Sequence, residues 1–173
     1  MVPTIEVLKS NIMTFVDAIR SKADFLGVFV AADEFTSLKF YSPHTNEKGK
    51  GLYTHFNEYG DCVYFMFVGD RLMKIGKAAG GNGWIGRAQQ YKRGIRGDNT
   101  NKLILSTLQE QNKYVIEILG IQTQRVDTSI ICPLTGDRVQ SSIETAETLE
   151  KFYTQQYLDE SEENELPFCK QLK

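Results

Sequence analysis

Tyr64, Lys74 and Arg87 are the residues whose types and spacing suggest chemistry on a phosphate. Tyr64 and Lys74 lie in two apolar runs, VYFMFV and RLMKIGKA, that flank the turn sequence GD. This pattern predicts a tight antiparallel hairpin, across which the two side chains meet. The lysine would lower the pKa of the tyrosine and make it a usable base, while the fork of the Arg87 guanidinium suits a scissile phosphate.

A metal ligand for such a site has to come from another part of the chain. The segment SIETAETLEKFYTQQYL opens with Ser/Thr and Glu, a capping signal, and predicts a helix. It offers the carboxylates of Glu144, Glu147 and Glu150. From the residues alone, any of the three could be the ligand.

The stretch KIGKAAGGNGWIGR also contains a literal G-x-G-x-x-G, formed by Gly81, Gly83 and Gly86. A dinucleotide site needs this motif inside a parallel β-α-β unit, with an acidic residue about 20 positions further on. Here the preceding strand is the second arm of a hairpin, and Glu110 falls near the end of a predicted helix. We therefore interpret the glycines as a flexible link between strand and helix, and expect no nucleotide cofactor.

The elements predict an α+β fold with a small, mainly antiparallel sheet flanked by helices. An amphipathic helix is expected from Thr4 to Lys22, a strand at FLGVFVAA, and a loop from Ser42 to Gly51. After residue 60 the expected order is β-β-α-α-β-(β)-α. The prediction divides the chain into an N-terminal helical and strand extension (1–60), a core (61–158) and a tail (159–173).

The charge distribution is uneven, although the net charge is only −2. Between Arg71 and Lys102 there are eight basic residues and one acid, whereas an acid-rich segment follows from Glu144. A local basic field attracts polyanions, although two oppositely charged solvated surfaces would give the same pattern. The candidate DNA-contacting residues are Lys77, Arg87, Lys92, Arg93 and Arg96.

The chain also carries signs of its compartment. No apolar run reaches the length that spans a bilayer, and the N-terminus lacks the pattern of an export signal. The three cysteines are widely spaced and odd in number. We therefore expect a cytoplasmic protein with reduced thiols and no membrane partner.

The run VYFMF…LMKIGKA…GRAQQY…TAETLEKF resembles the GIY-YIG nuclease superfamily, and the likeness extends from about residue 61 to 158. It is most similar to the branch of Type II restriction endonucleases whose second motif reads KIG. The resemblance implies hydrolysis of DNA phosphodiester bonds with one Mg²⁺ or Mn²⁺. It implies double-stranded DNA as partner, and cutting both strands of a symmetric site favours a homodimer.

The resemblance also assigns roles to residues. Tyr64 would activate the attacking water with help from Lys74, Arg87 would hold the scissile phosphate, and Glu147 would bind the metal. Gly76 matches the motif glycine that lets backbone and phosphate approach closely. Two positions depart from the pattern: Cys62 replaces the glycine of GIY, and Lys77 stands where related enzymes carry histidine. Lys77 remains a candidate for contact with the same phosphate.

Other interpretations remain open at this stage. A phage or mobile-element nuclease would use the same residues to nick DNA, degrade host DNA or home. A nucleic-acid-binding module that has lost catalysis would share the charge pattern. The segment 1–60 and the excursion TSIICPLTGDRVQSS are candidates for sequence recognition or dimer contacts, and their composition does not distinguish the two.

Overall fold

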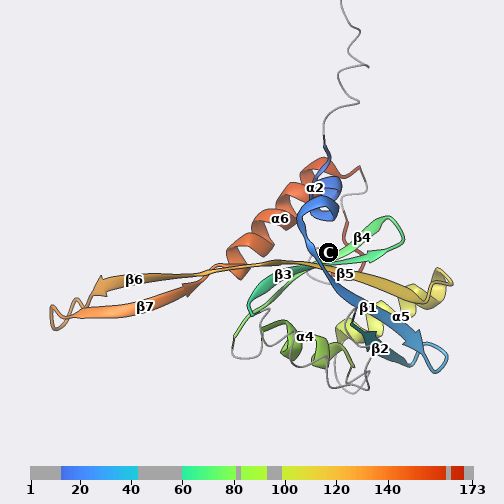
Figure 1. The fold of residues 1–173 in the computed structure, drawn as a ribbon, viewed down its shortest axis with the longest axis horizontal. Coiled ribbons are helices and arrows are strands. Elements are labelled where there is room, and N and C mark those ends of the chain that lie inside the picture. The colour runs from blue at the N-terminus through green and yellow to red at the C-terminus, as the bar shows by residue number, and fades with distance from the viewer. Residues whose placement is uncertain (1–12, 43–59, 81–82, 93–98, 163–164, 170–173) are drawn as a thin grey trace, which may run out of the picture.

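The computed structural model describes residues 13–42, 60–80, 83–92, 99–162 and 165–169. At its centre is an antiparallel five-stranded sheet with the order β2-β1-β5-β3-β4 (Figure 1). The strands are β1 (Asp24–Ala32), β2 (Ser37–Tyr41), β3 (Cys62–Val68), β4 (Arg71–Ala78) and β5 (Val115–Gln122). The expected α+β class with a mainly antiparallel sheet is confirmed.

Strand β3 lies at the heart of the molecule, and all seven of its residues are buried. Because side chains alternate along a strand, Tyr64 and Met66 join one hydrophobic cluster while Phe65 and Phe67 join the other. The sheet is therefore covered on both faces. This explains why the run CVYFMFV is apolar throughout rather than alternating.

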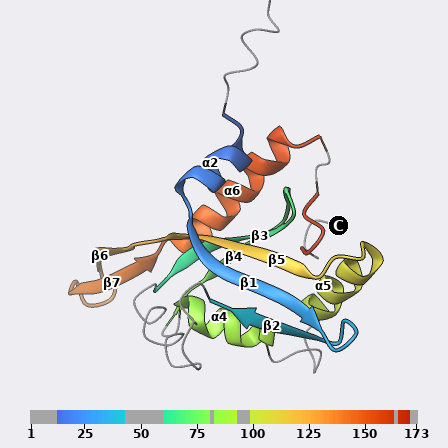
Figure 2. The same ribbon diagram turned by 45° about the vertical axis from the view of Figure 1, so that its right-hand side comes forward.

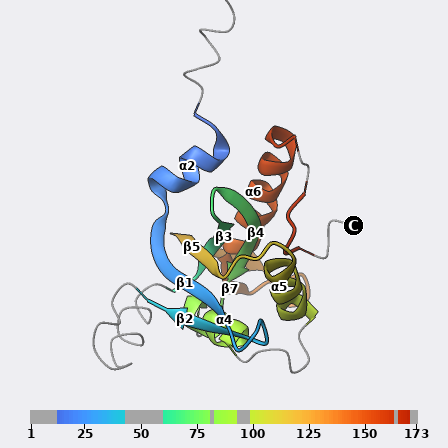
Figure 3. The same ribbon diagram turned by 90° about the vertical axis from the view of Figure 1, so that its right-hand side faces the viewer.

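Two pairs of helices supply the covers (Figures 2 and 3). Helices α4 (Gly83–Lys92) and α5 (Asn99–Glu110) contribute Trp84, Tyr91 and Ile104 to the cluster that contains Tyr64. Helices α2 (Phe15–Lys22) and α6 (Ala146–Glu160) contribute Ile19 and Tyr157 to the cluster on the opposite face. The sheet thus separates a layer of α4 and α5 from a layer of α2 and α6.

The N-terminal part of the chain shares this sheet. Strand β1 pairs with β5, so residues 24–41 extend the same sheet as the hairpin. Helix α2 begins at Phe15, because Thr14 is extended and forms a capping box with Asp17. The prediction of one continuous helix from Thr4 to Lys22 is therefore wrong, because Thr14 is extended and the helix begins after it. Residues 4–12, where the first turns were expected, lie outside the described residues. Most of the expected loop from Ser42 to Gly51 lies outside them as well.

The excursion after β5 forms a separate two-stranded ribbon. Its strands β6 (Arg125–Ile131) and β7 (Arg138–Glu144) pair antiparallel, and the ribbon projects away from the body of the molecule (Figure 1). Two turns expected from sequence, GD at 69–70 and PLTGD at 133–137, lie where the hairpins reverse. No helix among the described residues is long and apolar enough to cross a membrane.

Candidate active site at the edge strand

Tyr64 is buried in the layer between the sheet and helix α4. Its hydroxyl lies 2.7 Å from that of Tyr91, and its ring packs beside Trp84 with centroids 5.3 Å apart. Gly76 is the cross-strand partner of Tyr64, and a Cβ at residue 76 would overlap the Tyr64 phenol oxygen. The absence of a side chain at Gly76 therefore makes room for the Tyr64 hydroxyl.

Lys74 does not lie opposite Tyr64, and the expected direct meeting across the hairpin is wrong. A regular ladder through the GD turn would pair Lys74 with Phe65, on the far face of the sheet. A bulge between Met66 and Phe67 shifts the register, so that Lys74 pairs with Met66. Because Met66 and Tyr64 share a face, Lys74 lies diagonal to Tyr64 on the same side of the sheet.

The Lys74 ammonium contacts the C-terminal segment. It lies 3.4 Å from the carbonyl oxygen of Phe168 and 3.9 Å from the Cys169 sulfur. That segment is fixed, since Phe168 is fully buried and its N–H donates to the Met73 carbonyl at 2.9 Å. Part of the segment predicted as a C-terminal tail (159–173) thus packs against β4 next to Lys74.

The pKa of Tyr64 moves opposite to the expected direction. Burial raises the pKa of Tyr64 to about 12, while the Arg87 charge and the hydrogen bond with Tyr91 oppose this rise. Burial likewise raises the pKa of Tyr91. In the free protein both groups are therefore neutral phenols at pH 7, and Arg87 rather than Lys74 is the cation that acts on Tyr64.

Arg87 lies on the same face of α4 as Tyr91, one turn before it, with its guanidinium 5.9 Å from the centre of the Tyr91 ring. Nη1 of Arg87 donates to Gln90 at 2.8 Å. Its Nε is buried and has no hydrogen-bond partner among the described residues. The guanidinium also acts on Tyr64 through its charge and a side-chain hydrogen bond, so the Nε is the donor that remains for an added anion.

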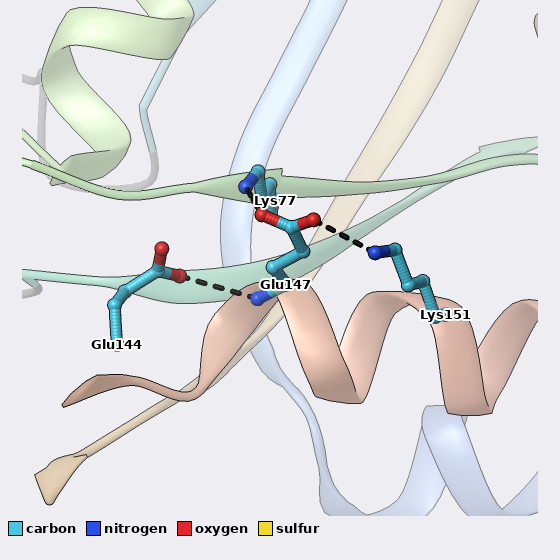
Figure 4. Close-up of polar contacts among 4 residues, drawn as sticks. All are labelled: Lys77, Glu144, Glu147 and Lys151. Carbon is cyan, nitrogen blue, oxygen red and sulfur yellow. Dashed lines mark hydrogen bonds and ion pairs between the residues drawn. The ribbon is translucent and has the colours of Figure 1, made fainter.

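Glu147 and Lys77 meet (Figure 4), on the face of β4 opposite to that of Lys74. The Lys77 ammonium forms an ion pair with Glu147 at 2.6 Å, and Lys151 contacts the other carboxylate oxygen at 2.8 Å. The hydrogen bonds from Lys151 and Lys77 lower the pKa of Glu147 to about 2. The same bond with Glu147 raises the pKa of Lys77. Glu147 is thus a permanent anion held at the start of α6.

Two further carboxylates flank Glu147. Glu144 accepts a hydrogen bond from the Glu147 backbone N–H at 3.2 Å, and so caps the helix. Thr145, at the N-cap position, donates its hydroxyl to the Gln124 carbonyl instead. Glu150 is half-buried and forms no hydrogen bond or ion pair with the residues that the structure describes. Burial raises the pKa of Glu150, while Lys77, Lys74 and Arg87 oppose the rise.

Strand β4 explains how groups on two faces of the sheet come near one another. In the part of the chain that the structure describes it is the last strand of the sheet, so no described strand beyond it separates the layer of α4 from the layer of α6. Glu150, on α6, lies close enough to influence the pKa of Tyr64 and of Arg87. A cleft of about 530 Å³ opens there, lined by Lys77, Ala78, Ala79, Gly80, Gly83, Gly86, Arg87, Gln90, Arg125 and Glu144.

The glycines of this region have a packing role. Gly83 begins α4 with φ +42°, and a Cβ there would overlap the Gly60 carbonyl, to which the Trp84 N–H donates at 3.1 Å. Residues 81–82 lie outside the described residues. The strand before the glycines is an antiparallel hairpin arm, as expected, so the dinucleotide motif lacks its parallel β-α-β setting.

Some of the predicted DNA-contacting residues meet in the cleft, and others do not. Lys77 and Arg87 line it, whereas Lys92 is exposed at the end of α4. Arg93 and Arg96 lie outside the described residues. Tyr91 and Arg125 are not among the residues predicted from the sequence. The spacing of four residues between Arg87 and Tyr91 puts both on one helix face, whereas no spacing pattern links Arg125 to the site.

No family model matches the chain, and no curated protein sequence matches it. The structure is similar to that of restriction endonuclease HPY188I in complex with product DNA, with TM-score 0.50 and 17% sequence identity over 99% of this chain and 93% of that chain. A mutant of bacteriophage T4 EndoII matches with TM-score 0.49 and 17% identity, over 80% of this chain and 90% of that chain. At this identity the first likeness shows a shared fold.

Proposed function

We propose that this chain is a Mg²⁺-dependent DNA endonuclease of the GIY-YIG type. The more specific proposal is a site-specific Type II restriction enzyme that cuts double-stranded DNA as a homodimer. One observation carries the proposal. Arg87 and Lys77 line one cleft at the edge strand. Arg87 lies beside Tyr91 of the buried phenol pair and has an Nε without a partner among the described residues, while Lys77 pairs with the anionic Glu147.

Arg87 and Lys77 are the residues that bind the phosphate in this proposal. The guanidinium of Arg87 presents a planar set of donors that matches two phosphate oxygens, and its Nε is the donor left over. Lys77 supplies a second positive charge once a DNA phosphate competes for it with Glu147. Both charges stabilise the negative charge that develops on the phosphoryl oxygens during cleavage.

Tyr64 is the proposed base that accepts the proton of the attacking water. With a pKa of about 12 it must first lose its own proton, and a phenolate at this position is stabilised by Arg87 and by a hydrogen bond donated from Tyr91. Lys74, on the same face, stays a proposed site residue, although Arg87 rather than Lys74 is the cation that acts on Tyr64. Phe168 and Cys169 hold its ammonium in place.

The acidic residues of α6 fit a divalent metal. Mg²⁺ is commonly held by one or two carboxylates, with substrate phosphate and water completing its shell. Among the described residues no group of three or more His, Cys, Asp or Glu side chains forms a ready-made cage. Glu147 stays ionised, and the half-buried carboxylate of Glu150 has no partner among the residues that the structure describes, which suits such a shared site. The bound metal would supply a Lewis acid for the phosphoryl oxygens.

The test is cleavage of plasmid DNA by the purified protein in the presence of Mg²⁺ or EDTA. We expect cleavage with Mg²⁺, none with EDTA, and none by Arg87→Ala. Lys22→Ala, at an exposed basic residue of α2 that does not line the cleft, is the control and should cut DNA. Binding of DNA without cleavage under every metal condition would favour the catalytically inactive module, and cleavage unchanged by EDTA would remove the metal from the proposal.

The ends of the cut DNA distinguish the restriction role from the phage or mobile-element role. Sequencing them should show one short symmetric site if this is a Type II restriction enzyme. Scattered nicks with loose sequence context would instead favour a nuclease that degrades or nicks host DNA.

A further inference from the structure

The projecting ribbon of β6 and β7 has two chemically different faces. Paired residues point to the same side, and consecutive pairs alternate between sides. One side carries two aliphatic pairs, Val126 with Ile143 and Ile130 with Val139, separated by the pair Thr128 and Ser141. Every charged residue of the two strands lies on the other side, namely Arg125, Asp127, Arg138 and Glu144.

The aliphatic residues are strongly exposed. The exposed fractions are 52% for Val126, 57% for Ile130, 45% for Val139 and 52% for Ile143. A two-stranded ribbon is marginally stable by itself, and a contiguous exposed apolar face marks a contact surface. Neither helix layer covers this face, since the ribbon extends beyond the five-stranded sheet (Figure 1).

The order of pairs on this face is the same from both ends. Counting outward from the Thr128–Ser141 pair, an aliphatic pair follows in each direction. Consider a second ribbon that faces the first and is related to it by a two-fold axis, which lies between the two ribbons and runs perpendicular to the strands. This arrangement would place Val126 of one copy against Ile130 of the other, and Val139 of one copy against Ile143 of the other. It would also place Thr128 against its own copy. A face that complements itself in this way is the requirement for an isologous dimer.

We propose that the apolar face of the β6–β7 ribbon binds the same face of a second copy of this chain. Charge favours a second copy over DNA as the partner of this face. The face has no cation that could pair with phosphates, and the same face of a second copy is likewise uncharged and apolar. The active cleft remains accessible in such a dimer. Arg125 and Glu144, which line the cleft, belong to the opposite face of the ribbon.

The size of the face sets the strength of the dimer. Seven residue pairs make a ribbon about 23 Å long and roughly 10 Å wide. The area of this face is well below the about 800 Å² that each partner buries in a standard interface. Leu134, 92% exposed at the tip, adds apolar surface. The ribbon therefore supplies only part of a standard interface, so we expect a dimer that dissociates on dilution. This inference specifies the homodimer of the proposed function, but its test uses neither DNA nor metal.

The first test is sedimentation equilibrium of the full chain without DNA. We expect the mass to rise with concentration from 19.7 kDa toward twice that value. Ile130→Asp with Val139→Asp should raise the dissociation constant by more than about tenfold. Ser129→Asp with Gln140→Asp, on the opposite face, is the matched control and should leave the dissociation constant unchanged. A chain that is monomeric at every concentration would overturn the proposal.

A cross-link locates the axis. In a Cys132→Ser, Cys169→Ser background, Thr128→Cys should join two copies through a short bifunctional maleimide, because residue 128 faces its own copy. Ser129→Cys in the same background points away from the axis and should remain uncross-linked. Equal cross-linking of both variants would contradict the arrangement. If Ile130→Asp leaves association unchanged but weakens binding of a DNA duplex in EDTA, DNA is the occupant and the proposal is wrong.

Discussion

The hydroxyl groups of Tyr64 and Tyr91 lie 2.7 Å apart in the buried layer between sheet and helix α4, with the Arg87 guanidinium beside the Tyr91 ring. One phenol of the pair can donate to the other, so each satisfies a polar group that would otherwise be buried alone. The pair also lets Tyr91 donate to a Tyr64 phenolate. It therefore connects the stability of the core with the chemistry that we propose.

Tyr91→Phe should lower both stability and cleavage. The change leaves the Tyr64 hydroxyl buried without its partner, which costs about 1–3 kcal/mol of unfolding free energy. It also removes a donor to the proposed phenolate, so the cleavage rate should fall by about tenfold or more. Urea unfolding and plasmid cleavage measure the two effects. Tyr114→Phe, at a half-exposed tyrosine, is the control and should change neither.

The cleavage rate should rise with pH between about pH 7 and 9. Because the pKa of Tyr64 is raised to about 12, the base form is scarce at neutral pH and increases up to tenfold per pH unit. Single-turnover rates with Mg²⁺ at constant ionic strength measure this slope. Tyr64→Phe should be inactive at every pH. A fully active enzyme with a flat profile would show that Tyr64 is not the base.

Stability should be lost at alkaline pH. The folded-state pKa of Tyr64, about 12, lies above its ordinary value of 10.0, so the fold favours the protonated phenol. This contribution is complete below pH 10 and is lost as pH rises from 10 to 12, by up to about 3 kcal/mol. Urea unfolding across this range measures the loss, and the ultraviolet absorbance of tyrosinate reports the ionisation. Tyr64→Phe should show a shallower loss, and identical curves for both proteins would contradict the prediction.

Substitutions of the glutamates at the end of β7 and in α6 should identify the metal ligand. Glu147→Gln should abolish cleavage with little change in stability, because Glu147 is exposed and its ion pairs lie at the surface. Glu150→Gln should weaken the dependence on Mg²⁺ if its half-buried carboxylate shares the ion, and Glu144→Gln should act chiefly on the helix cap. Titrating cleavage with Mg²⁺ measures each effect. Normal Mg²⁺ dependence in Glu147→Gln would transfer the ligand role to Glu150 or Glu144.

Gly76→Ala should destabilise the protein by about 1–3 kcal/mol, because its Cβ overlaps the Tyr64 phenol. Cleavage should fall with it, since the phenol has to move. In a Tyr64→Ala background the overlapping ring is gone, so the same substitution should cost much less. Urea unfolding of the four proteins gives the coupling between the two sites. Equal costs in both backgrounds would mean that Gly76 has another role.

The sequence by itself determined the local elements and the residue types of the site. The two apolar runs around GD specify the hairpin of β3 and β4, and the capping signal of Ser/Thr and Glu indicates the helix α6, because these signals depend only on neighbours along the chain. Tyr64 and Arg87 were recognisable as candidates from residue type and spacing, whereas only the resemblance to the GIY-YIG superfamily singled out Glu147 from Glu144 and Glu150.

Only the tertiary structure decided how these residues meet. The bulge that moves Lys74 onto the face of Tyr64 depends on packing of the sheet, and no turn signal predicts it. Tyr91 enters the site because α4 folds back over β3, and Glu147 enters because β4 is the last strand of the sheet. The raised pKa of Tyr64 follows from burial, which depends on contacts between segments far apart in the chain.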